Sequence, residues 1–395
     1  MRKEAERRQE PPEKRIGDSR SMKSTRTVGR WSWAWRLAVA MVVALSFGCG
    51  QKEDPQEESA EPKAVDPVQK TDPAAIKADT QEPKPTTPTQ SLPPDFANYT
   101  ETIPGTKVTF DMIAVPGGTF VMGSAKSEAG RKDDEGPAHE VTVGPFWVGK
   151  AEVTWDEYDA FRDACPGLPK GTPESDEAKL EDVDGVTGPT TAYGDPYRGF
   201  SGGKQPAVGI SWHAAMTHCV WVSKVTGKFY RLPTEAEWEL ACRAGSKGSF
   251  CFGDDAANLD EYAWHKGNSS HQPHKVATKK PNAWGIYDMH GNVSEWCLDW
   301  YQADFYASIA SGKWPPDPRG PQKGLNHAIR GGMFEGDALR LRCASRDRSQ
   351  DWWLTLDPQE PKSKWWHVPT NFLGFRVVRP LKEEKPPVRE SRRGL

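Results

Sequence analysis

The residues that interrupt helices and strands limit the fold of this chain more than any other feature of its sequence. Its 395 residues include 36 glycines and 34 prolines, together roughly 18% of the chain, and neither is favoured inside a helix or a central strand. There are also 17 tryptophans, far above ordinary usage. This composition excludes a coiled coil, an all-helical bundle and a multi-span membrane protein, and predicts an irregular fold with an aromatic-rich core.

Charge is unevenly distributed along the chain. The whole sequence has 52 basic and 55 acidic residues, a net charge of −3. Residues 1–48 hold 11 of the basic and 5 of the acidic residues, which leaves 41 basic and 50 acidic residues in the remainder, a charge close to −9. Because binding to a phosphate backbone needs a basic surface, we expect no nucleic acid partner.

A short apolar stretch predicts an export signal. Residues 37–47 are almost entirely apolar, follow three arginines and end at Gly48 and Cys49. About a dozen apolar residues are too few to span a bilayer and are typical of a signal peptide.

Gly48-Cys49 resembles a bacterial lipoprotein cleavage site. We expect residues 1–48 to be removed, with translation starting at Met1 or Met22. We expect Cys49 to carry a lipid that holds the chain in the periplasm or at the outer membrane; ordinary secretion and an uncleaved anchor are alternatives.

Composition divides the rest of the chain into three parts. Residues 49–100 are rich in Pro, Glu, Lys and Thr and have almost no aromatic residues, so they cannot bury enough apolar area to offset their ordering entropy. We expect a disordered, extended tether there, a folded domain over residues 101–381, and a disordered tail over residues 382–395.

Within the predicted domain, short strand patterns precede helix-start patterns. Strands are expected at residues 108–113, 119–122, 139–143 and 146–148. Helices are expected to begin at Thr154, Ser211 and Thr234. Thr154 and Thr234 each precede a glutamate by three positions, the spacing of a capping box. The pattern predicts an α+β fold with few short helices, short strands and much irregular chain.

Seven motifs in a fixed order resemble the formylglycine-generating enzyme, or sulfatase-modifying factor, family. They are VPGGTFVMG at 115–123, EVT at 152–154, PAVGISW at 206–212, RLPTEAEWE at 231–239, GIYDMHGNVSEW at 285–296, RGG at 330–332 and GFR at 374–376. The resemblance implies a divergent C-type-lectin-like fold, low in regular secondary structure.

The same resemblance predicts that the oxidase chemistry of the family is absent. Family members that generate formylglycine hold copper with two cysteine thiolates, which are soft ligands suited to Cu(I). The position that matches one of them is Ala338, and the stretch that would carry the other has no cysteine. Ser294 and Met333 also replace residues usual in the family. We therefore expect no copper and no catalytic residue.

The residues around these positions are candidates for a binding groove. They are Ser294, Met333, Glu335, Asp337 and Arg346. We interpret the chain as a non-catalytic binding or scaffold module in the cell envelope, with an envelope protein or peptide as ligand. Two alternatives stay open. One is an enzyme with altered oxidase or maturation chemistry, and the other is retained formylglycine generation.

The resemblance also implies a structural calcium ion. Its ligands would be the side chains of Asp288 and Glu295 and the backbone carbonyls of Gly291 and Val293. Carboxylates and carbonyl oxygens are the ligands that Ca²⁺ prefers. The alternative is that the two carboxylates accept hydrogen bonds from loop N–H groups.

Cysteines and histidines offer further candidates. Cys242 and Cys343 match family positions joined by a disulfide, which an exported domain allows. The pairing of the other cysteines stays open: Cys165, Cys219, Cys251 and Cys297. A local histidine cluster, His265, His271 and His274, is more typical of a solvated loop than of a metal site, and we interpret His290 as a structural hydrogen-bonding residue.

Overall fold

The computed structural model describes residues 92–164, 199–200, 202–309, 315–356 and 366–382. The chain divides into two units, Met1–Thr80 and Gln81–Leu395, and all described residues belong to the second. Cys49, Cys165, the predicted signal peptide and most of the predicted tether and tail lie outside the described residues. No helix among the described residues is long and apolar enough to cross a membrane.

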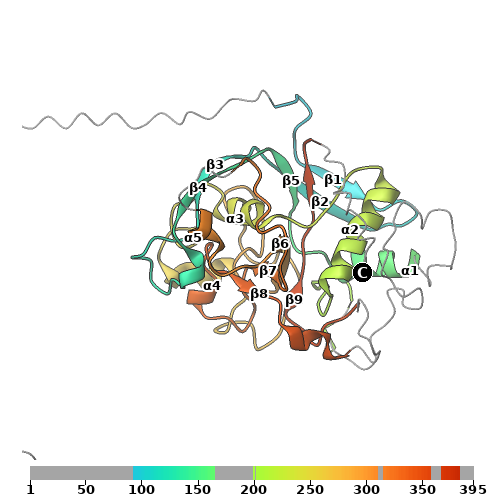
Figure 1. The fold of residues 1–395 in the computed structure, drawn as a ribbon. Helices are drawn as coiled ribbons and strands as arrows, with labels where there is room; N and C mark the ends of the chain where they lie inside the picture. Colours follow the sequence, from blue (N-terminus) through green and yellow to red (C-terminus); the bar gives the residue numbers. More distant parts are fainter. Residues whose placement is uncertain (1–91, 165–198, 201, 310–314, 357–365, 383–395) are drawn as a thin grey trace, which may run out of the picture. The chain divides into compact units, whose positions relative to one another are not determined.

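The strands form three small sheets (Figure 1). The first is antiparallel, in the order β1 (Tyr99–Thr102), β2 (Thr109–Val115), β5 (Phe146–Gly149) and β10 (Val378–Pro380). The second pairs β3 (Gly118–Met122) with β4 (His139–Val143). The third has the order β8 (Asp347–Arg348), β7 (His327–Arg330), β6 (Ser294–Trp300) and β9 (Leu373–Gly374), with β6 and β9 parallel.

The helices are short, and long loops join them. The α-helices are α1 (Trp155–Ala164), α2 (Trp212–Thr226), α3 (Glu235–Arg243), α4 (Leu259–Tyr262) and α5 (Phe305–Ile309). The 3₁₀ turns are η1 (Asp133–Glu135), η3 (Ala256–Asn258), η4 (Ala338–Arg340) and η5 (Asp351–Leu356). The α+β prediction is confirmed, and β2 to β5 overlap the four predicted strands.

The three predicted helix starts are confirmed, because α1, α2 and α3 begin one residue after Thr154, Ser211 and Thr234. Ser211 accepts the Ala214 N–H at 3.1 Å at the start of α2. Thr234 and Glu237 form a complete capping box at the start of α3, because each side chain accepts the backbone N–H of the other residue. At the start of α1 the arrangement differs, since the Thr154 hydroxyl donates to the Glu157 carboxylate at 2.8 Å.

Aromatic side chains fill the core, as the composition predicts. One cluster surrounds α1 and α2 and includes Trp155, Trp296 and Trp366, each at most 2% exposed. A second cluster lies around α3 and the strands β2 to β5 and includes Trp238. Large rings bury much apolar area without requiring long regular elements.

Helix α3 is buried along its whole length although it contains three glutamates. Each glutamate faces an arginine. Glu237 pairs with Arg231 at 2.6 Å, and Glu239 pairs with Arg243 at 2.8 Å. Arg330 of β7 bridges Glu235 at 2.9 Å and Glu239 at 2.6 Å.

These arginines keep the buried glutamates ionised. Burial alone would raise the pKa of Glu235, but the guanidinium groups of Arg346 and Arg330 lower it below its ordinary value. The same balance, with Arg243 and Arg330, lowers the pKa of Glu239. An uncompensated carboxylate in this interior would cost several kcal/mol, so the ion pairs are a condition for burying α3.

We expect Arg330→Met to destabilise the domain by roughly 3–5 kcal/mol, because it leaves two buried carboxylates without a shared partner. Urea denaturation followed by tryptophan fluorescence measures the change. Lys280→Met is the matched control: it breaks an ion pair with Glu261 whose side chains are 60% and 53% exposed, and should leave the midpoint unchanged. Equal midpoints for the two variants would contradict the role given to Arg330.

Candidate functional site

A groove of about 230 Å³ lies beside β6, β7 and β8. Its walls come from these strands, from the segment that contains η4, from η5 and from Lys132 before η1. These strands lie next to one another in the third sheet (Figure 1). The groove therefore gathers residues from distant parts of the sequence onto one rigid sheet.

Three of the five predicted groove residues line this groove: Ser294, Met333 and Arg346. The Ser294 hydroxyl donates to the Gly332 carbonyl at 2.9 Å, so it links β6 to the segment that follows β7. Glu335 and Asp337 do not line the groove. Glu335 is exposed and lies 3.4 Å from His271, and Asp337 caps η4 by accepting the Arg340 N–H at 3.2 Å.

Arg346 is fixed in the groove wall by buried partners. Its guanidinium donates to both carboxylate oxygens of Glu235, at 2.7 and 2.9 Å, and to the Asp134 carbonyl at 2.7 Å. The side chain is fully buried. Arg346 therefore shapes the wall and does not offer a free charge to a ligand.

The exposed charge of the groove comes from residues that the sequence analysis did not single out. Lys132, Arg340 and Arg348 are exposed and line the groove, as does one exposed acid, Asp347. In the described part of the chain, neither Arg340 nor Arg348 forms an ion pair with a carboxylate. The groove thus presents an excess of positive charge.

Aromatic residues add an apolar surface to this charge. Trp352, Trp353 and Phe372 line the groove. Trp352 is 54% exposed, whereas Trp353 is 5% exposed and packs against Trp296. Trp366, by contrast, is in the core.

The position expected for a copper ligand lies in η4. Ala338 begins this turn and packs against a small apolar cluster with Leu341. The nearest cysteine in sequence, Cys343, is fully buried, and no cysteine lines the groove as described. The residues present therefore do not fit a two-thiolate copper site in the groove.

Among the expected calcium ligands, Glu295 already has hydrogen-bond partners. It accepts two hydrogen bonds from Arg376, each 2.5 Å, and one from the Trp238 ring N–H at 2.8 Å. One oxygen of Asp288 has no partner among the described residues. The calcium site at Asp288, Gly291, Val293 and Glu295 stays a prediction.

Asp288 interacts electrostatically with a second buried carboxyl group, that of Glu152. Both residues are 2% exposed. Among the described residues, no donor reaches Glu152 Oε2 or Asp288 Oδ1. Two adjacent carboxyl groups can hydrogen-bond only if one is protonated, and burial together with the charge of Asp288 raises the pKa of Glu152 well above its ordinary value.

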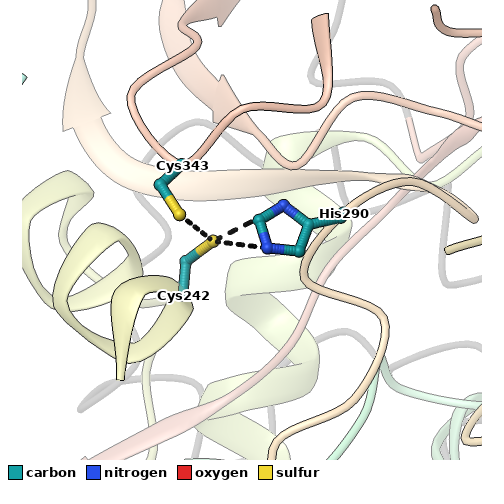
Figure 2. Close-up of side chains that lie close together, drawn as sticks. All are labelled: Cys242, His290 and Cys343. Carbon is teal, nitrogen blue, oxygen red and sulfur yellow. Dashed lines mark hydrogen bonds between the residues drawn. The ribbon is translucent and has the colours of Figure 1, made fainter. Parts of the chain in front are cut away.

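The predicted disulfide pair lies in a buried cluster with His290 (Figure 2). Cys242 and Cys343 are free thiols whose sulfur atoms are 3.4 Å apart, against about 2.05 Å in a disulfide. The Cys242 sulfur lies between the Cys343 sulfur and the His290 ring (Figure 2). Burial raises the pKa of Cys343, but its contacts with Cys242 and His290 lower it to about 5.

The remaining candidates are dispersed. His265 contacts Asp260 at 2.6 Å, His271 contacts Glu335, and His274 stacks on Trp264 with ring centres 3.7 Å apart. Among the described residues, these histidines form no metal-ligating cluster. Cys219 and Cys297 are buried free thiols, and Cys251 is a half-buried one.

Comparisons with known proteins agree with this picture of the fold. The profile of the sulfatase-modifying factor enzyme 1-like domain matches residues 100–381. The formylglycine-generating enzyme of Thermomonospora curvata is 30% identical, over 60% of this chain and 87% of that protein. The serine/threonine-protein kinase pkn1 of Chlamydia pneumoniae is 31% identical over 60% of this chain, and the match spans only 35% of that kinase. The structure of PvdO from Pseudomonas aeruginosa superposes with a TM-score of 0.51 and 29% identity, over 69% of this chain and 94% of that one.

The Glu152–Asp288 pair predicts a specific pH dependence. In the folded chain the pKa of Glu152 is raised well above its ordinary value of 4.5, so Glu152 keeps its proton at pH values where the unfolded chain has lost it. The folded state then binds more protons than the unfolded state, and the free energy of unfolding falls as pH rises above 4.5. Glu152→Gln cannot ionise and still offers a donor to Asp288. We expect it to reduce this loss, by up to about 1.4 kcal/mol per pH unit.

Urea denaturation between pH 4.5 and pH 8 measures the effect. The control is Glu140→Gln, which removes an exposed glutamate of β4 and should leave the slope of stability against pH unchanged. Parallel slopes for the wild type and Glu152→Gln would show that the pair does not share a proton.

Proposed function

The chain belongs to the sulfatase-modifying factor enzyme 1-like domain family, and from this premise we propose that it is a non-catalytic binding module whose groove takes an acidic peptide segment with apolar or aromatic side chains. The observation that carries the proposal is the lining of the groove, which combines exposed cations with aromatic residues and contains no thiol.

The loss of oxidase chemistry is supported by what occupies the family positions. Formylglycine generation by copper needs two thiolates that reach one ion. Here the matching segment supplies Ala338, and Cys343 is fully buried and does not line the groove. Ser294 and Ser345 line the groove, but Ser294 already donates its hydroxyl to a backbone carbonyl. The described lining offers no activated nucleophile.

The acidic character of the ligand is supported by charge complementarity. Lys132, Arg340 and Arg348 face the groove with one opposing carboxylate, that of Asp347. A cleft lined by one sign of charge concentrates ligands of the opposite sign and raises their association rate. The rest of the chain is acidic, so this cationic site also distinguishes an acidic ligand from the surrounding surface.

The apolar part of the ligand is supported by the exposed ring of Trp352 beside Met333 and Phe372. Aromatic residues in clefts are frequent anchors for binding energy. An extended peptide suits this lining because successive side chains point to opposite sides, so that some can reach the rings while others meet the cations. The predicted export signal and the lipid on Cys49 would present this site to envelope proteins.

Binding of fluorescein-labelled peptides tests the proposal. We expect an acidic peptide with one central phenylalanine to bind more tightly than the same peptide with each Glu replaced by Lys. The double variant Arg340→Glu with Arg348→Glu should weaken binding roughly tenfold, about 1.4 kcal/mol, and reduce its dependence on salt. Fluorescence anisotropy measures both effects.

Lys224→Glu is the control, since Lys224 is an exposed cation of α2 outside the groove. It should leave the affinity unchanged. Equal affinity for the acidic and basic peptides, or an equal loss in the Lys224 variant, would overturn the proposed specificity.

A second experiment tests the absence of oxidase activity. Incubated with copper and a Cys-x-Pro-x-Arg peptide, the chain should leave the cysteine unconverted, because its groove has no thiolate pair. Mass spectrometry of the peptide measures aldehyde formation, with the Thermomonospora curvata enzyme as the positive control. Robust conversion would show that another group replaces the missing thiolates.

A further inference from the structure

Three side chains that commonly bind metals meet in the interior, away from the groove lining. Cys242 is near the end of α3, His290 is in the loop before β6, and Cys343 lies between η4 and β8. Each is at most 1% exposed, and one ligand atom from each lies within 4.8 Å of the others. Chain segments up to 101 residues apart thus bring their polar groups to one point.

We propose that Cys242, His290 and Cys343 form a structural zinc site, with Cys251 as the candidate for a fourth ligand. Zinc is bound by cysteine sulfur at about 2.3 Å and histidine nitrogen at about 2.0–2.1 Å. A tetrahedral ion at these lengths separates two sulfurs by about 3.8 Å and a sulfur and a nitrogen by about 3.6 Å. The corresponding distances here are 3.4 Å between the sulfurs and 3.8 Å from Cys242 Sγ to His290 Nε2.

The orientation of His290 supports this assignment. Its Nδ1 lies 2.7 Å from the Leu341 carbonyl, and only a ring N–H can bond to a carbonyl oxygen. This leaves the lone pair on Nε2, the arrangement that a metal-binding histidine usually has, because its second nitrogen donates to a carbonyl or carboxylate. In the structure Nε2 accepts the Cys251 backbone N–H at 3.0 Å, and zinc would take the place of that hydrogen bond.

Cys251 is the candidate for the fourth ligand, although its sulfur is not among the ligand atoms that lie within 4.8 Å of one another. It lies in the turn between Phe250 and Gly253, and its backbone N–H donates to His290 Nε2 at 3.0 Å. To bind the same ion, its side chain would have to turn toward the cluster. Phe250 and Phe252 pack against His290, with ring centres 5.6 and 5.7 Å away. Two thiols and one imidazole in an apolar surround supply three of the four ligands of a structural zinc site.

Zinc would connect the core to the groove. Cys343 lies between Arg340 and Arg348 in the segment that forms one wall of the groove. A metal bond to Cys343 would fix the middle of this segment against α3 and the loop before β6. The site is independent of the ligand proposed for the groove, because its metal content can be measured without any peptide.

Metal analysis of the full-length chain tests the site. The protein is purified with a phosphine reductant and analysed by inductively coupled plasma mass spectrometry, and we expect one zinc ion per chain. Replacement of zinc by Co²⁺ should give thiolate-to-cobalt charge-transfer absorption and the intense visible bands of a tetrahedral site. Cys343→Ser should lose the metal, whereas Cys297→Ser, which changes a buried cysteine of β6 outside the cluster, should keep it.

Cys251→Ser separates the fourth ligand from the other three, and we expect it to retain zinc with at least tenfold weaker affinity in competition with a chromophoric chelator. The same titration on the wild type keeps the test decisive if Cys343→Ser does not fold. Reduced wild-type protein that binds no zinc even when supplied with it would overturn the proposal. A Cys242–Cys343 disulfide found by peptide mapping of the isolated chain would also overturn it.

Discussion

The buried arginine–glutamate network around α3 is the interaction on which the rest of the described structure depends. A helix with three interior glutamates is stable only when each carboxylate meets a guanidinium, because an unpaired charge in this interior costs several kcal/mol. The partners of Glu235 come from 95 and 111 residues later in the chain. Burial of α3 therefore requires β7 and the segment before β8 to pack against it at the same time. Folding is then cooperative, and the stabilising contacts are non-local in sequence.

The same network sets the shape of the groove. Arg330 donates to the backbone carbonyls of Cys343 and Ser345, at 2.9 and 3.2 Å, in addition to binding the two glutamates. Arg346 extends from the groove wall to Glu235. The wall is thus held by charge-assisted hydrogen bonds to α3, which are stronger than neutral ones. A ligand site built this way is rigid although little of it is regular secondary structure.

The sequence predicts what depends on neighbouring residues and misses what depends on distant ones. The capping box of Thr234 and Glu237 spans four residues, so its pattern is visible in the sequence and the helix begins where expected. The resemblance brings Ser294 and Met333 to the groove, but the Gly336 N–H bonds back to the Met333 carbonyl at 2.7 Å. Glu335 lies within this turn and Asp337 just after it, and neither residue lines the groove. No local pattern indicates that Lys132 and Arg348 line the same groove, or that His290 lies beside the two cysteines.

Charge pairing in the interior also explains why the groove remains cationic in an otherwise acidic chain. Glu235 already pairs with Arg330 and Arg346, and Glu335 lies against His271. Only Asp347 remains among the described lining residues to oppose Lys132, Arg340 and Arg348. Cations without an opposite charge add no stability to the fold, and these three are therefore available to a ligand that carries carboxylates. The neutralised network of Glu235, Arg330 and Arg346 meanwhile holds the wall that carries them.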